Sequence, residues 1–293
     1  PDLAPPGAVD LGDLPHVPRP DAGAVAAAWD ARRPGLAAPL GRGPGRAPVT
    51  LDLVADGPHA LVAGTTGAGK SELLSTLVLA LATAHPPERL AVLLVDFKGG
   101  TGLGAVAGLP HVLEHVTDLD TARTHRVLTG LRAEVRRRER ILAERGVTDL
   151  TDLTDVADRR TGEPTPPPRL LVVVDELRAL ADDVPDAVAT LARLAAQGRS
   201  LGIHLVLATQ RPAGVVSADL RANVGLRIAL RVTDEADSRD VVEAVDAARI
   251  DARLPGRALV RRGSRPLELV QVARARPGVG TPPARLARAP RRP

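Results

Sequence analysis

The 293-residue chain has no cysteine, methionine or tyrosine, and only one phenylalanine and one tryptophan. Without cysteine, neither a disulfide framework nor a thiolate metal site is possible, which slightly favours the cytosol. The core must be aliphatic, and a hydrophobic content of 44% is enough to build a large one. No apolar run is long enough to span a membrane, and no signal peptide is visible. Since methionine is missing even at position 1, we expect a piece of a longer chain, with anchors or partner domains outside it.

Lysine is nearly absent as well. Of the 39 basic residues, 37 are arginines, and the two lysines are Lys70 and Lys98. Where lysine persists in such a background, its compact ammonium group is expected to be needed rather than a positive charge alone. The pI of 10.6 does not indicate nucleic-acid binding, because the formal net charge is only +4 and few groups titrate before arginine.

Composition divides the chain into three parts. Residues 1–48 form a lead-in rich in Pro, Gly and Arg, with a short helix predicted in AGAVAAAWDARRP. Trp29, the only tryptophan, is expected to pin this lead-in to the domain surface. Residues 49–275 form the predicted domain, and residues 276–293 have the composition of a disordered basic tail.

Within 49–275, short apolar runs alternate with longer helical segments. This alternation predicts an α/β fold with a mostly parallel sheet covered by helices on both faces. The predicted strands are 59–64, 90–97, 169–176, 203–209 and 225–232, and the predicted helices are 70–84, about 119–145 and about 185–198. RALVRR and PLELVQV, on either side of GS, predict a C-terminal β-hairpin.

The segment GTTGAGKS matches the phosphate-loop pattern G-x-x-x-x-G-K-[ST], and it follows a predicted strand and begins a predicted helix. Its glycines allow backbone N–H groups to turn toward phosphates, and the helix N-terminus adds partial positive charge. Lys70 is expected to reach the β and γ oxygens of ATP, and Ser71 to hold Mg²⁺. The predicted nucleotide-binding residues are Gly64, Thr65, Thr66, Gly67, Ala68, Gly69, Lys70, Ser71 and Glu72.

Polar residues end two further predicted strands. LLVVVDE ends in Asp175, assigned to the Mg²⁺ shell, and Glu176, assigned as the general base that activates water. Glu176 could instead be a helix-capping acid. Gln210, in LATQR, could hydrogen-bond the γ-phosphate or the attacking water, with a surface turn residue as the simpler alternative.

Several segments together resemble the motor domain of the FtsK/SpoIIIE family, which includes the EccC ATPases of type VII secretion. The matching segments are GTTGAGKSELL, VDFKGG followed by GLPHV, EVRRRERIL, LLVVVDE, GRSLGIHLVLATQRP, ANVGLRIALRV and DSRDVV with PGRALV, which cover about residues 48–272 in order. DFKGG and GLPHV look more like EccC, whereas ATQRP looks more like the DNA pumps. The chain has a single phosphate loop, and the DNA pumps' extra winged-helix domain is absent from it.

The resemblance implies a RecA-like fold with strand order 5-1-4-3-2 and ATP hydrolysis at subunit interfaces, usually in a ring of six, coupled to translocation of a polymer. The leading hypothesis is an EccC-like ATPase that drives protein export, as a cytoplasmic domain of a membrane-associated parent with tandem domains. The alternatives are a translocase of double-stranded DNA and a nucleotide-binding docking domain with little turnover. The isolated fragment could be monomeric.

In that strand order, the strand ending in DFK lies at the sheet edge, three strands from the phosphate loop. The separation is roughly 14 Å, and a lysine side chain extends only about 6 Å, so Lys98 is not expected to touch its own γ-phosphate. Lys98 could pair with Glu176 as a switch, reach a neighbouring subunit, or form a salt bridge with Asp96.

An arginine supplied by a neighbouring subunit is expected in such rings, because charge develops on the γ-phosphoryl group. Arg199, in QGRSLGIH, precedes a strand at the end of the sheet away from its own ATP, so it could serve only a neighbour. Arg137 and Arg138, on the predicted basic helix, are the competing candidates. The simpler expectation for the arginines of that helix is a solvated charged face.

Overall fold

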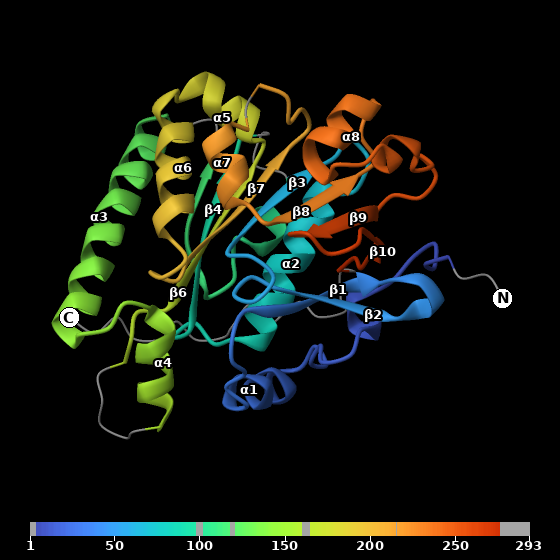
Figure 1. The fold of residues 1–293 in the computed structure, drawn as a ribbon. Coiled ribbons are helices and arrows are strands. Elements are labelled where there is room, and N and C mark those ends of the chain that lie inside the picture. Colours follow the sequence, from blue (N-terminus) through green and yellow to red (C-terminus); the bar gives the residue numbers. More distant parts are fainter. Residues whose placement is uncertain (1–3, 98–101, 118–120, 160–164, 215, 276–293) are drawn as a thin grey trace.

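The computed structural model describes residues 4–97, 102–117, 121–159, 165–214 and 216–275 (Figure 1). In these ranges the strands form one ten-stranded sheet in the order β2-β1-β10-β9-β8-β3-β7-β6-β4-β5. No helix within them is long and apolar enough to cross a membrane.

The parallel part of the sheet carries the phosphate loop. Its strands are β3 (His59–Ala63), β4 (Leu90–Asp96), β5 (Val112–Thr117), β6 (Arg169–Asp175), β7 (Ile203–Thr209) and β8 (Leu226–Leu230). Every residue of β3, β4, β6 and β7 is buried, as expected for parallel strands covered on both faces. The order β8-β3-β7-β6-β4 is the predicted 5-1-4-3-2, and the predicted fold class is confirmed.

The prediction that the DFK strand lies at the sheet edge is wrong. β5 pairs with β4 in parallel and forms that edge instead. We missed β5 because an edge strand needs little apolar sequence: VLEHVT has a single buried residue, Val116, and Leu113 is 70% exposed. The β3 and β4 strands are still separated by β7 and β6, as the distance argument for Lys98 assumed.

Helices cover both faces of the sheet, and β6 shows how its residues divide between them. Leu171 and Val173 belong to the core beneath α2 (Lys70–Ala84), whereas Val172 and Val174 belong to the core beneath the opposite helices. Those helices are α3 (Thr121–Arg145), α5 (Leu177–Asp183) and α6 (Asp186–Gln197), which lie together in Figure 1. The helices predicted at 70–84, 119–145 and 185–198 correspond to α2, α3 and α6.

The remaining helices are short. They are α1 (Ala22–Asp30), α4 (Leu150–Arg159), α7 (Ala218–Asn223) and α8 (Glu235–Val242), with 3₁₀ turns at Leu11–Asp13, Pro44–Arg46, Gly104–Val106 and Asp246–Arg249. Both α7 and α8 begin at side-chain caps, in which Ser217 accepts from the Leu220 amide and Asp234 from the Asp237 amide. The sequence predicted α1 within AGAVAAAWDARRP, but periodicity missed α7 and α8, because segments of fewer than about ten residues carry too few turns to show it.

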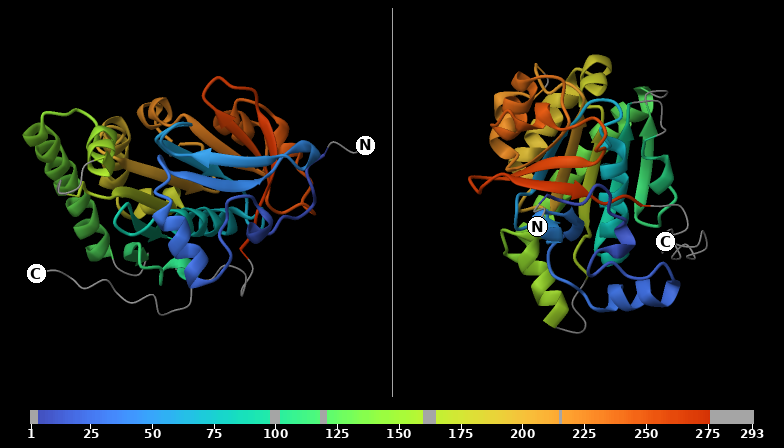
Figure 2. Two further views of the ribbon diagram at one scale, coloured as in Figure 1. Left: turned by 90° about the horizontal axis from the view of Figure 1, so that it is seen from below. Right: turned by 90° about the vertical axis from the view of Figure 1, so that its right-hand side faces the viewer.

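The predicted C-terminal hairpin is present and extends the sheet. Its strands, β9 (Arg257–Arg262) and β10 (Glu268–Val272), pair antiparallel to β8 and to β1 (Ala37–Arg42), and β1 pairs with β2 (Pro48–Asp52). In Figure 2 the blue strands β1 and β2 lie with the red strands β9 and β10, on the side of the molecule away from green α3. The lead-in thus contributes a strand, β1, to the sheet.

Trp29 holds α1 against α2, as predicted for the lead-in. Its indole N–H donates to the carbonyl oxygen of Ala82 at 3.0 Å, and its ring meets the His111 ring edge-on with centroids 5.7 Å apart. The helix begins at Asp21, whose side chain accepts a hydrogen bond from the Ala24 amide.

Candidate active site

The carboxyl ends of β3, β6 and β7 meet at one end of the sheet, and each is followed by a predicted functional segment. The phosphate loop follows β3, and α2 begins at Lys70, directly after it. Gly67 and Gly69 have φ values of 77° and 101°, in the left-handed region that glycine adopts without strain. The first turn of α2 leaves backbone N–H groups without helical partners, which makes this end of the helix suited to an anion.

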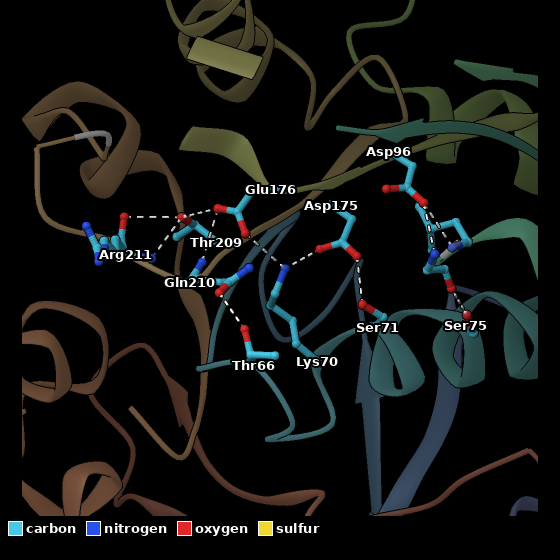
Figure 3. A network of polar contacts seen from close by, with 12 residues as sticks. Thr66, Lys70, Ser71, Ser75, Asp96, Asp175, Glu176, Thr209, Gln210 and Arg211 are labelled. Carbon is cyan, nitrogen blue, oxygen red and sulfur yellow. Dashed lines mark hydrogen bonds and ion pairs between the residues drawn. The ribbon is translucent and has the colours of Figure 1, made fainter. Parts of the chain in front are cut away.

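Lys70, Ser71 and Asp175 form a polar cluster where the phosphate loop leads into α2 (Figure 3). The Lys70 ammonium donates to Asp175 Oδ1, and the Ser71 hydroxyl donates to Asp175 Oδ2 at 2.9 Å. Asp175 is fully buried at the end of β6, and Lys70 is 4% exposed. This ion pair satisfies both charges in the protein interior.

Glu176 holds a strained position next to Asp175. Its φ and ψ are 72° and 69°, a left-handed conformation that is uncommon for a residue with a side chain. It stands at the N-cap position of α5, but its side chain makes no capping hydrogen bond to that helix. The strain turns the carboxylate toward β7 and the phosphate loop (Figure 3).

The two oxygens of the Glu176 carboxylate have different surroundings. Oε1 accepts hydrogen bonds from the Thr209 hydroxyl at 3.1 Å and from the Gln210 amide at 3.2 Å. Oε2 is buried and has no hydrogen-bond partner in the described part of the chain, and it lies 3.7 Å from the Lys70 ammonium. One oxygen is therefore held in place while the other can accept a proton.

Gln210 joins this cluster to the phosphate loop. Its side-chain oxygen accepts a hydrogen bond from the Thr66 hydroxyl at 2.9 Å, and its backbone amide binds Glu176. Gln210 therefore contacts both the loop and the candidate base, rather than standing alone as a surface turn residue.

Two other predicted loop residues make contacts away from this cluster. The backbone amide and hydroxyl of Thr65 both donate to the carbonyl oxygen of Arg231, after β8. Glu72 is exposed, and its carboxylate accepts from the Ala275 amide at 3.1 Å. The Thr65 and Glu72 side chains thus fasten the loop and α2 to neighbouring segments.

The oxygen ligands around Asp175 suit a magnesium ion. Mg²⁺ prefers hard oxygen donors and keeps several of its waters, and a serine hydroxyl beside a strand-end carboxylate provides such donors. Ser71 Oγ and Asp175 Oδ2 lie together at the start of α2, and a Cβ built on Gly102 would lie 2.8 Å from Asp175 Oδ2. The residues therefore fit the ion, and Gly102 lies directly against them.

The three candidate trans arginines lie in different environments. Arg138 is 3% exposed, and its guanidinium donates to Glu134 and to the carbonyl oxygens of Pro168 and Leu201. Arg137 pairs with Glu134 through two hydrogen bonds at the surface. Arg199 is exposed in the turn before β7, at the end of the sheet opposite the phosphate loop. The guanidinium of Arg138 is thus used in contacts within its own chain, whereas Arg199 is exposed and could be reached by another subunit.

The possible switch residue, Lys98, lies outside the described residues, and so do residues 276–293, predicted as a disordered tail. The described residues nearest to Lys98 in sequence do contribute to the site. Asp96 is fully buried at the end of β4, and its Oδ2 accepts hydrogen bonds from the amides of Gly102 and Leu103.

Sequence reasoning missed Thr209 as a partner of Glu176 and Gly102 as a neighbour of Asp175. Thr209 was visible as a hydroxyl residue directly before Gln210, at the end of an apolar strand. Gly102 gave no signal, because no pattern in VDFKGGTG indicates which residue it approaches.

Comparison with known proteins agrees with this geometry. The family model described as "FtsK/SpoIIIE family" matches residues 23–214, which include the phosphate loop, Asp175, Glu176 and Gln210. The chain belongs to the FtsK/SpoIIIE family. Within this family it is 41% identical, over 221 residues, to the type VII secretion system protein EssC of Staphylococcus aureus (strain Mu50 / ATCC 700699). The match covers 75% of this chain and 15% of EssC.

Solved structures from the family have the same fold. The cytoplasmic domain of the type VII secretion ATPase EccC from Thermomonospora curvata matches with a TM-score of 0.84 and 34% identity, over 91% of this chain and 32% of that one. A second T. curvata EccC structure holds ATPases 2 and 3 in complex with a signal sequence peptide. It matches with a TM-score of 0.74 and 30% identity, over 84% of this chain and 44% of that one. The chain thus spans only a fraction of these FtsK/SpoIIIE relatives.

Proposed function

We propose that this chain is an ATP-hydrolysing motor domain of the EccC type. The observation that carries the proposal is the Glu176 carboxylate. One oxygen is held by Thr209 and Gln210, and the other is buried without a hydrogen-bond partner in the described residues and lies 3.7 Å from the Lys70 ammonium. A docking domain with little turnover would not need a base held in a strained backbone conformation beside a phosphate loop.

In the proposed reaction, the loop and Lys70 bind the phosphates of ATP. Lys70 exchanges its contact with Asp175 for the β and γ oxygens. Ser71 and Asp175 would hold Mg²⁺, which would neutralise charge on the phosphates when bound. Glu176 accepts a proton at Oε2 from the attacking water. Gln210 contacts Thr66 and Glu176, so a shift of the loop on nucleotide binding would reach the base and the segment after β7.

We further propose that the polymer moved by this motor is a secreted protein. The support is the similarity to EssC, a type VII secretion system protein, and to an EccC whose structure is a complex with a signal sequence peptide. The parent would be a membrane-associated protein with tandem ATPase domains on its cytoplasmic side, and the active state would be a ring of six subunits, as the resemblance to the family implies. A double-stranded DNA substrate remains the alternative, supported by ATQRP and by the exposed Arg211 that follows Gln210.

The catalytic part of the proposal is tested with a Glu176→Gln variant. We expect ATP turnover to fall by about a hundredfold or more, because general-base catalysis contributes that much, while nucleotide binding is retained. A Glu88→Gln variant is the matched control, because Glu88 is exposed near the start of β4, at the opposite end of the sheet. Equal turnover in Glu176→Gln and the parent would exclude Glu176 as the base.

The substrate is tested by measuring turnover against protein concentration, alone, with duplex DNA and with a candidate secreted peptide. Stimulation by the peptide supports protein export. Stimulation by DNA that falls steeply with salt concentration supports the DNA alternative, because DNA binding releases counterions. A turnover per subunit that rises with concentration supports assembly into a ring.

A further inference from the structure

Gly102 lies against the two residues that would hold the metal, although it comes from a different strand connection. A Cβ built on Gly102 would lie 2.8 Å from Asp175 Oδ2 and 3.1 Å from Ser71 Oγ. The first distance is shorter than real Cβ contacts allow, so a side chain at this position would have to displace the carboxylate or the loop.

The loop cannot easily move away, because it is anchored on both sides of Gly102. The amides of Gly102 and Leu103 donate to Asp96 Oδ2 at 3.1 and 3.2 Å, and the Ser75 hydroxyl donates to the Gly102 carbonyl oxygen at 3.0 Å. Figure 3 shows Asp96 and Ser75 on either side of this contact, next to Ser71 and Asp175.

Asp175 has equally little freedom. It is fully buried, with Oδ1 bound by Lys70 and Oδ2 by Ser71. Asp96 and Asp175 are paired residues at the ends of neighbouring strands, yet they have separate partners: Asp96 holds the loop, whereas Asp175 faces Lys70 and Ser71. Asp96 therefore positions Gly102 over the Ser71–Asp175 pair.

The position leaves no room for a side chain. The Cβ of any other residue would lie against the two oxygens that would hold the ion, so only glycine fits here without moving them.

We propose that Gly102, held by Asp96 and Ser75, lets the loop lie against the Ser71–Asp175 pair without moving the two oxygens that would hold Mg²⁺. Gly102 is thus a positioning residue that determines metal affinity, and its role rests on the proposed ATPase function. A methyl group there would push the Asp175 carboxylate or the Ser71 hydroxyl out of place, while the phosphate-binding amides of the loop would stay where they are.

The test measures binding of a non-hydrolysable fluorescent ATP analogue at increasing Mg²⁺ concentration and in EDTA. The Mg²⁺ midpoint is the Mg²⁺ concentration at which half of the full enhancement of nucleotide binding is reached. For Gly102→Ala, we expect this midpoint to rise about tenfold or more, as it does when residues that support metal ligands are removed. Affinity in EDTA should stay within about threefold of the parent, because the metal-free contacts are intact. Gly104→Ala is the matched control. Gly104 lies on the same loop, its φ is not positive, and a Cβ there meets nothing within 4 Å.

An unchanged Mg²⁺ midpoint in Gly102→Ala, or an equal shift in Gly104→Ala, would overturn the proposal. If Gly102→Ala does not fold, the Ser75→Ala variant tests the proposal instead, because it adds no atoms and releases the Gly102 carbonyl oxygen. A severalfold higher Mg²⁺ midpoint in Ser75→Ala supports the proposal, and an unchanged Mg²⁺ midpoint refutes it. Failure of the inference leaves parent nucleotide binding intact, whereas failure of the proposed function would appear as a parent that binds no nucleotide at all.

Discussion

At the scale of single residues, the site depends on a few side chains with unequal surroundings. In Glu176, hydrogen bonds fix one carboxylate oxygen, and the other has no hydrogen-bond partner in the described residues. The Lys70 ammonium lies close enough to both Asp175 and Glu176 to stabilise either carboxylate. A base that must accept a proton benefits from this asymmetry, because orientation comes from one oxygen and reactivity from the other.

Thr209 is the residue whose role is best tested by mutation. Its hydroxyl lies 3.1 Å from Glu176 Oε1 and also 3.1 Å from the carbonyl oxygen of Arg211, but it has only one hydrogen to donate. We predict that Thr209→Val lowers the ATP turnover number about tenfold, the value of one hydrogen bond to a charged group, and changes KM by less than about threefold. Steady-state kinetics check this.

Thr209→Ser provides the conservative control, because it keeps the hydroxyl and removes only a methyl group. Its turnover should remain near that of the parent. If Thr209→Val and Thr209→Ser lose turnover equally, packing rather than the hydrogen bond accounts for the effect.

At the scale of elements, Arg138 fastens α3 to the starts of two buried strands. Its guanidinium donates to Pro168, just before β6, and to Leu201 and Gly202, just before β7. Burial lowers the pKa of Arg138, and the hydrogen bonds that it donates to Glu134 and to the carbonyl oxygens offset the cost of the buried charge. The helix therefore has a structural arginine within a largely solvated basic face.

We predict that Arg138→Ala lowers the free energy of unfolding by about 3 kcal/mol, because it removes the donor to the carbonyl oxygens of Pro168 and Leu201 and one of the two arginines that bind Glu134. Arg137→Ala, which removes only a surface ion pair with the same glutamate, should cost less than about 1 kcal/mol. Urea unfolding measures both values. Similar costs for the two variants would refute the structural role of Arg138.

At the scale of the whole molecule, the sheet separates a catalytic end from an opposite end that contains buried histidines. Burial lowers the pKa of His59 to about 4 and that of His204 to about 3, and burial with help from Arg89 lowers the pKa of His85 to about 4. All three stay neutral in the folded chain at neutral pH.

Stability should therefore fall as the pH is lowered from about 6.5 to about 4. In this range the unfolded chain binds protons that the folded chain excludes, so protonation favours unfolding, by about 3 kcal/mol for His59 alone. Below the folded pKa values both states are protonated and this loss levels off. Urea midpoints at pH 7, 6 and 5 check the prediction. The exposed His125 provides the control, because His125→Gln should leave the pH dependence unchanged.

Assembly is the second prediction at this scale. If Arg199 completes a neighbour's site, Arg199→Ala alone should lose most of its turnover, whereas mixing it with Glu176→Gln should restore part, because some interfaces then combine an intact base with an intact arginine. Arg193→Ala, an exposed arginine on α6, is the control and should be active alone. No recovery in the mixture would exclude a trans role for Arg199.

Local sequence patterns alone predicted the phosphate loop, the strand-end acids and the parallel strands. Each of these features depends on residues that are close together in the sequence, such as an apolar run followed directly by glycine or an acid. The sequence could not reveal contacts between distant segments. The strained turn that aims Glu176 at Thr209, the burial of Arg138 beneath two strand connections and the approach of Gly102 to Asp175 each join residues dozens of positions apart. Only the tertiary structure decided them, because each depends on which strands lie side by side and how closely their connections pack.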